Sequence, residues 1–152
     1  MDILNLLNIQ AENRVPAKEY ENITLKALRA ENKNTLIFYF TYGNAETGIL
    51  EYFIEDQRDG NCQIYVEKEN QVWNKEMTKE MVVKELERIL QPIKQWKESY
   101  NDLTLEEEGY SWEITFVSSD GKVTSAGFED VPEKYEMVRK AIEEWFEKHV
   151  VV

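Results

Sequence analysis

Histidine and cysteine each occur once in this 152-residue chain, so the common nucleophilic mechanisms would depend on a single side chain. His149 is the only base available to a Ser-His-Asp or Cys-His arrangement. It falls in the last turn of an expected helix, where an imidazole can hydrogen-bond free carbonyls and favours the negative helix end. Cys62 falls in an alternating apolar strand, as expected for a small buried thiol. The sequence therefore favours structural roles for both residues.

Carboxylates are the other groups that could support chemistry, and the chain has 30 of them. Glu55, Asp56 and Asp59 come closest to an oxygen-ligand metal site, but no spacing matches a zinc site or a twelve-residue calcium loop. The six glycines form no phosphate-binding loop. Some carboxylates will pair on any fold, so pairing alone does not indicate acid–base catalysis. We expect no cofactor, no metal and no enzymatic activity, and we rank a carboxylate-based, metal-dependent enzyme as the third alternative.

Two sequence features could instead form a binding surface. The first is the set of four tryptophans, of which Trp96, Trp112 and Trp145 fall on expected strands or core stripes, while Trp73 lies outside any regular pattern. The second is the acidic run Glu106-Glu107-Glu108 in a loop before the last expected hairpin. A solvated loop explains this run without a function, but nuclease inhibitors can also place carboxylates where phosphates would lie.

The net charge restricts the class of partner. It is -12, and residues 101–152 hold 13 acidic and 5 basic side chains, so the negative charge is concentrated in the C-terminal third. Nucleic acid would be repelled and a basic protein surface attracted. We therefore expect no nucleic-acid partner, although solubility alone also explains an acidic surface.

The hydrophobic pattern predicts one mixed domain over residues 1–152. Residues 36–42 form the strongest expected strand, with apolar side chains on both faces, so both faces should be at least partly covered. The other expected elements are a short helix over residues 3–9, strands at 23–30, 49–54 and 62–66, a helix from Val82 to Trp96 that breaks near Gln91 because of Pro92, a hairpin around Asp120-Gly121, and a helix from Pro132 toward His149.

This order indicates the α+β class, with an antiparallel meander sheet of about six strands, the order α-ββββ-α-ββ-α, and helices packed against the sheet. One cysteine permits no internal disulfide, which is typical of a reducing compartment. Residues 1–9 lack a basic leader region, and no apolar run approaches the roughly 20 residues that a bilayer span needs. We expect a cytoplasmic protein without a membrane partner.

Three stretches of the chain resemble one protein family. They are Val15-Pro16-Ala17-Lys18-Glu19-Tyr20 with the strands at 23–28 and 37–40, the helix from Val82 to Trp96, and Trp112-Glu113-Ile114-Thr115-Phe116 through Asp120-Gly121-Lys122 to Gly127-Phe128-Glu129-Asp130. Together they resemble the small acidic immunity proteins that accompany LXG-type polymorphic toxins of Gram-positive bacteria. The resemblance implies an antitoxin that binds the C-terminal domain of its cognate toxin, often a nuclease, inside the producing cell. It implies no catalytic residues.

The leading hypothesis is therefore a non-enzymatic immunity protein that blocks a basic toxin domain. The residues that we expect to face this partner are Glu106, Glu107, Glu108, Glu129 and Asp130, with Trp73 as a binding hot spot. The second hypothesis is a structural or adaptor module that pairs with itself or another protein through an edge strand. The sequence does not determine the oligomeric state or the identity of the toxin.

Overall fold

The computed structural model describes residues 35–44, 48–68, 71–101 and 110–150. The described elements are β1 (Leu36–Asn44), β2 (Gly48–Asp56), β3 (Asn61–Lys68), β4 (Gln71–Thr78), α3 (Lys79–Ile89), the 3-10 helix η3 (Gln91–Gln95), β5 (Ser99–Asn101), β6 (Ser111–Ser118), β7 (Gly121–Phe128) and α4 (Tyr135–His149). The α+β class is confirmed. The expected helix at 3–9 and the expected strand at 23–30 lie outside the described residues.

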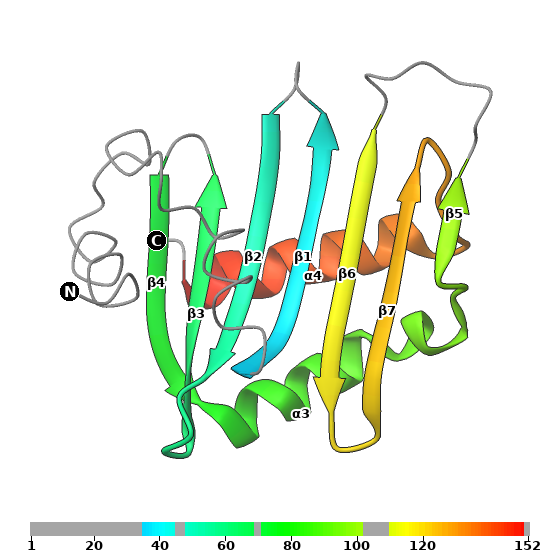
Figure 1. Cartoon of the computed structure of the whole chain (residues 1–152). Helices are drawn as coiled ribbons and strands as arrows, with labels where there is room; N and C mark the ends of the chain where they lie inside the picture. The colour runs from blue at the N-terminus through cyan, green and yellow to red at the C-terminus, as the bar shows by residue number, and fades with distance from the viewer. Residues whose placement is uncertain (1–34, 45–47, 69–70, 102–109, 151–152) are drawn as a thin grey trace.

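The strands form one seven-stranded sheet in the order β4-β3-β2-β1-β6-β7-β5 (Figure 1). β1 to β4 form an antiparallel meander, and β6 then pairs antiparallel with the free side of β1. β5 pairs parallel with β7 and closes that edge of the sheet. The expected meander of about six strands is therefore wrong in strand number and order, because β1 lies at the centre of the sheet and one edge strand is parallel.

Two of the differences from the sequence-based expectation have clear physical reasons. β4 was not expected, because Lys75 and Glu76 interrupt its apolar alternation and charged residues are common on strands at a sheet edge. β5 has only three residues and pairs with a strand more than 20 residues away, so no local pattern indicates it. The break before Pro92 is confirmed, since α3 ends at Ile89 and η3 begins at Gln91.

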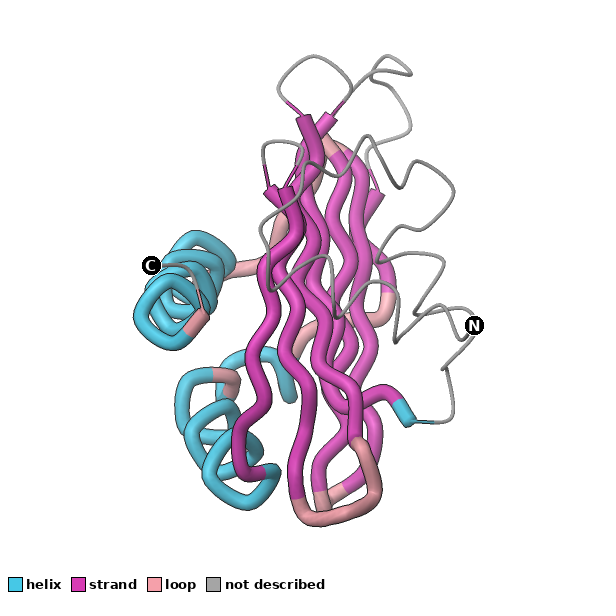
Figure 2. The backbone as a smooth tube through the Cα atoms, turned by 90° about the vertical axis from the view of Figure 1, so that its left-hand side faces the viewer, coloured by secondary structure: helices cyan, strands magenta, loops and turns pink. Residues whose placement is uncertain are grey.

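One face of the sheet packs against α3 and α4, which both lie on the same side (Figure 2). The cross-strand neighbours Phe38, Ile54 and Phe116 are at most 3% exposed on this face. α3 buries Val82 and Leu86 against them, and α4 buries its own apolar stripe. The members of that stripe are Tyr135, Val138, Ile142, Trp145 and Phe146. Burial of a large apolar side chain contributes about 1.5 to 3 kcal/mol, so this layer contributes strongly to the stability.

A polar contact joins the two helices above this core. Trp145 Nε1 donates a 2.8 Å hydrogen bond to Glu85 Oε1 on α3, and His149 Nε2 lies 3.5 Å from the same carboxylate oxygen. The His149 ring also packs 4.7 Å from the Trp145 ring. His149 therefore lies in the last turn of α4 as expected, and its described contacts link α4 to α3.

None of the described helices is long and apolar enough to cross a membrane.

Cys62 provides a direct test of this core. It is fully buried on the helix-facing side of β3, and burial raises the pKa of its thiol to about 12, with a further contribution from the nearby Asp56 carboxylate. We predict that the folded protein does not react with an aromatic disulfide reagent at pH 8, and that one thiol per chain reacts after unfolding in urea. A Ser119→Cys variant, with a second thiol in the exposed β6–β7 turn, should react at once with one equivalent. Rapid labelling of Cys62 in the folded wild type would contradict the structure.

Candidate partner-binding groove

A groove of about 650 Å³ opens between η3, β5 and the segment that leads into α4. Trp96 and Tyr100 contribute half-buried aromatic side chains to it, and Asp130, Val131 and Glu133 contribute exposed ones. Val131 is 42% exposed, which is high for a residue of this size and type. The groove thus combines an aromatic wall, an apolar contact and two carboxylates, which is a composition found at protein-binding sites.

Edge-on and tilted contacts with other rings hold the aromatic wall in place. The Trp96 ring packs edge-on against Trp112 with centroids 5.7 Å apart and lies 6.1 Å from Tyr135. Tyr100 lies 6.0 Å from the same Trp112 ring, and its hydroxyl accepts a 2.8 Å hydrogen bond from the Lys97 backbone N–H. Because Trp112 and Tyr135 are almost fully buried, they form a rigid support beneath the groove.

Hydrogen bonds that involve the backbone position Glu129 and Asp130 at the edge of the groove. Trp112 Nε1 donates to the Asp130 backbone carbonyl at 2.8 Å, so the indole fixes the chain and leaves the Asp130 carboxylate exposed. Glu129 has a left-handed backbone with φ of 53°, and its N–H donates to the Tyr110 carbonyl at 2.8 Å. The Tyr110 N–H donates in return to Glu129 Oε1 at 2.6 Å. The Glu129 carboxylate therefore has a structural partner, whereas Asp130 is the better placed to meet another molecule.

The structure brings together only part of the residue set expected from the sequence. Glu129 and Asp130 lie beside the groove, and Glu106, Glu107 and Glu108 lie outside the described residues. Trp73 is half-buried against the core on β4, which is the edge of the sheet opposite to β5. Trp73 and Asp130 therefore cannot belong to one small site. Trp96 and Tyr100 were not expected at a surface groove, because their spacing continues the apolar stripe of the preceding helix.

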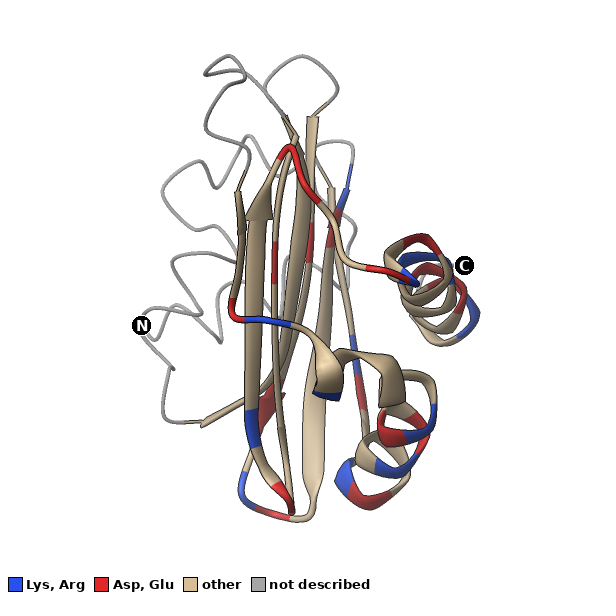
Figure 3. Ribbon diagram, turned by 90° about the vertical axis from the view of Figure 1, so that its right-hand side faces the viewer, with Lys and Arg blue, Asp and Glu red and all other residues tan. Residues whose placement is uncertain are grey.

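The described helices do not present a surface of a single charge sign. Basic residues and glutamates are interspersed along α3 and α4 (Figure 3). Arg139 illustrates this, since its guanidinium pairs with Glu136 at 2.5 Å and with Glu143 at 2.7 Å. The negative charge of the chain must therefore act mainly through other parts of its surface.

Arg139 and Glu143 also belong to a half-buried polar cluster that joins α4 to β1. The Tyr42 hydroxyl donates to Glu143, and Arg139 lies 5.5 Å from the centre of the Tyr42 ring. Burial, together with the Glu143 carboxylate, raises the pKa of Tyr42 far above its usual value. The phenol therefore stays protonated at neutral pH and acts as a hydrogen-bond donor, so the cluster fixes α4 on the sheet.

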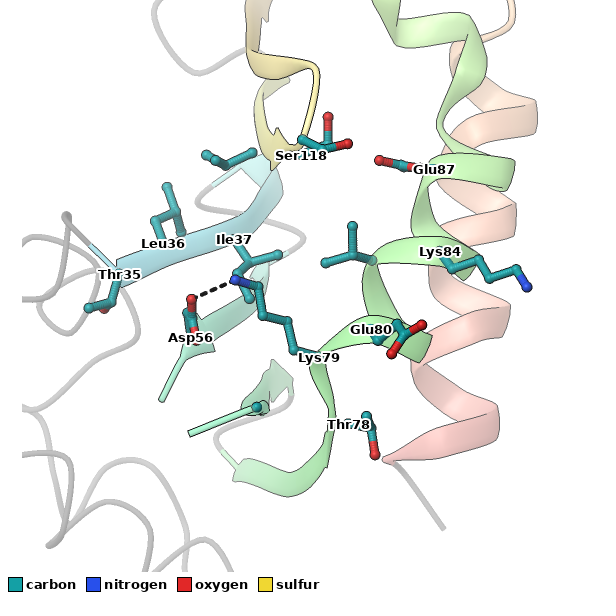
Figure 4. Close-up of a pocket in the computed structure, with 14 residues that line it drawn as sticks. Thr35, Leu36, Ile37, Asp56, Thr78, Lys79, Glu80, Lys84, Glu87 and Ser118 are labelled. Atoms are coloured by element: carbon teal, nitrogen blue, oxygen red, sulfur yellow. Dashed lines mark hydrogen bonds and ion pairs between the residues drawn. The ribbon is translucent and has the colours of Figure 1, made fainter. Parts of the chain in front are cut away.

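A second hollow, of about 710 Å³, lies between the start of α3 and the end of the sheet (Figure 4). Polar and charged side chains outnumber the apolar ones in its lining, and Asp56 pairs there with Lys79 at 2.8 Å. Burial opposes ionisation of Asp56, but the hydrogen bonds from Lys79 and from the Arg58 N–H lower its pKa. Asp59 accepts a hydrogen bond from the Asn61 N–H at 2.9 Å. Within the described ranges, no three histidine, cysteine or acidic side chains are grouped so that they could hold a metal ion.

No protein-family model and no curated protein matches the chain.

Gly127 tests how tightly the groove is supported. A Cβ atom at this position would lie 2.4 Å from Trp112 Nε1, 2.6 Å from the Asp130 carbonyl oxygen and 2.7 Å from the Tyr100 carbonyl oxygen. We predict that Gly127→Ala lowers the free energy of unfolding by about 1 to 3 kcal/mol, because backbone and indole must move apart. Urea denaturation measures this change. Lys122→Ala, on an exposed position of the same strand, should change stability by less than about 0.5 kcal/mol. Equal effects of the two substitutions would show that Gly127 is not tightly packed.

Proposed function

We propose that this protein is a non-enzymatic immunity protein, which binds the C-terminal toxic domain of a cognate polymorphic toxin and neutralises it in the cytoplasm of the producing cell. The observation that carries the proposal is the groove, in which exposed Asp130 and Glu133 lie beside the aromatic wall of Trp96 and Tyr100. The resemblance of three sequence stretches to immunity proteins of LXG-type toxins supports the same function.

The charge of the whole chain favours a basic toxin domain, such as a nuclease. A net charge of -12 attracts a cationic surface over roughly a Debye length, about 8 Å at physiological ionic strength. Lys97 and Lys134 also line the groove and balance its two carboxylates. The long-range attraction therefore comes from the whole protein, and the groove provides the short-range contacts.

The groove suits a basic side chain of the partner as an anchor. An arginine could lie against the Trp96 ring, where its guanidinium gains about 0.5 to 2 kcal/mol from the aromatic face. Asp130 can then accept its hydrogen bonds in a charge-assisted pair. A stable complex commonly buries about 800 Å² on each partner, so the toxin domain would also cover surface around the groove. Aromatic residues and arginine are the side chains that most often dominate such interfaces.

A structural or adaptor module that pairs through a sheet edge is the second candidate. β4 forms one edge of the described sheet and offers eight residues to a further strand. However, Lys75 and Glu76 place exposed charges on this strand, which disfavours pairing between edges. Light scattering that shows a stable homo-oligomer would favour this candidate over the immunity protein.

Charge removal at the groove tests the proposed function. The probe is the C-terminal domain of the toxin encoded beside the gene for this chain, purified in an inactive form. We predict a one-to-one complex with the wild type, and a dissociation rate about three- to tenfold higher for the double variant Asp130→Asn, Glu133→Gln, because it loses the short-range charge-assisted contacts. Surface plasmon resonance at several salt concentrations measures this rate, and the affinity of the variant should depend less on the salt concentration than that of the wild type.

The matched control is the double variant Glu80→Gln, Glu144→Gln, which removes the same charge from exposed positions on α3 and α4. It should bind within about twofold of the wild type. Equal losses in both variants would assign the effect to total charge and exclude the groove as the binding site. Failure of the wild type to bind the toxin domain or to protect cells that express it would refute the immunity function.

A further inference from the structure

The face of the sheet that points away from α3 and α4 carries a row of buried aromatic side chains. Tyr39, Phe53 and Tyr65 are paired neighbours across β1, β2 and β3, so they lie side by side. They are 2%, 0% and 1% exposed, and Val72 on β4 is 2% exposed. The Phe53 and Tyr65 rings lie 5.7 Å apart. Such side chains on an open sheet face would be accessible to solvent.

The described helices do not account for this burial. Both helices lie on the opposite side of the sheet (Figure 2), and none of these four residues belongs to the core cluster that the helices share with the sheet. Polar atoms on this face are also shielded from solvent, namely Glu51 Oε2, Glu55 Oε2 and Asn74 Nδ2. A further layer must therefore cover this face.

Residues 1–34 precede the central strand in the sequence and are long enough to form that layer. They join the described chain at Thr35, directly before the central strand β1. Seven strands at about 4.8 Å spacing give a sheet about 30 Å wide, which some ten extended residues can cross. The segment includes the apolar residues Ile3, Leu4, Leu6, Leu7, Ile23 and Leu25.

One stretch of this segment has a charge opposite to that of a row of glutamates on the sheet face. Glu67, Glu51 and Glu113 lie in one row across β3, β2, β1 and β6, with Thr41 between them. Each of these glutamates takes part in a contact. Residues 22–30 carry Lys26 and Arg29 and no acidic side chain. Three directly neighbouring or near-neighbouring carboxylates would repel one another on a sheet unless basic groups compensate them.

We infer that residues 1–34 dock on this face of their own sheet, with apolar contacts to the row of Tyr39, Phe53 and Tyr65 and with Lys26 and Arg29 near the glutamate row. The sheet then forms the middle layer of the protein. This face is occupied by the chain itself and does not bind the toxin domain. The inference stands independently of the proposed function, because it rests on the burial of described residues.

The test uses the full chain with a specific protease site inserted between Asn34 and Thr35. After cleavage under native conditions, we expect the peptide of residues 1–34 to elute with the rest of the protein in size-exclusion chromatography. Phe53→Ala removes the central ring of the row and should increase the fraction of released peptide at least about tenfold. Val72→Ser is a milder second variant in case Phe53→Ala does not fold, and it should increase release as well. Met137→Ala, on an exposed residue of α4, should release no more than the wild type.

Two outcomes would overturn the inference. In the first, the peptide separates from residues 35–152, and this remaining fragment keeps its circular dichroism spectrum and does not bind a hydrophobic dye. In the second, light scattering of the uncut protein gives twice the monomer mass, and dilution to the monomer exposes Tyr39 and Tyr65 to solvent, which would assign the face to a second copy of the chain.

Discussion

The whole architecture depends on the fact that the central strand buries side chains on both of its faces. Ile37, Phe38, Tyr39 and Phe40 are consecutive and at most 3% exposed, although alternate residues of a strand point in opposite directions. A sheet of this kind needs a covering layer on each side, because a large apolar side chain gains about 1.5 to 3 kcal/mol only when it leaves water. α3 and α4 supply one layer, and the inferred docking of residues 1–34 supplies the other.

This constraint determines which surfaces remain for a partner. With both faces covered, an approaching protein meets the outer sides of the helices, the sheet edges and the ends of the strands. The helices carry balanced charges, and β4 places charged residues at its edge. The groove at the β5 edge differs from these surfaces, because buried Trp112 and Tyr135 support a half-exposed Trp96 beside exposed acidic side chains. The proposed immunity function makes use of this one preorganised site, and the charge of the chain guides a basic partner toward it.

Short-range sequence patterns predicted many of the helices, strands and turns, whereas strand pairing between distant segments could not be predicted from the sequence. The turns near Asp59-Gly60 and Asp120-Gly121 and the break before Pro92 depend on a few neighbouring residues, and the structure has all three. β5 depends on β7, which lies more than 20 residues further along, so its existence could not be inferred from its own three residues. Glu129 and Asp130 were expected at a binding surface from the charge and the family resemblance, and the structure places Asp130 in the lining of the groove. Trp96 was assigned to a helical stripe, and only the 3-10 helix before it shows that the indole reaches the groove.

Hydrogen–deuterium exchange of the protein, alone and with the neighbouring-gene toxin domain, tests the location of the binding surface most directly. We predict slower exchange in residues 91–101 and 129–134 when the complex forms, while β1 and β2 at the centre of the sheet keep the protection that they already have in the free protein. Slower exchange confined to β4 or to the outer side of α4, with none around the groove, would contradict this prediction.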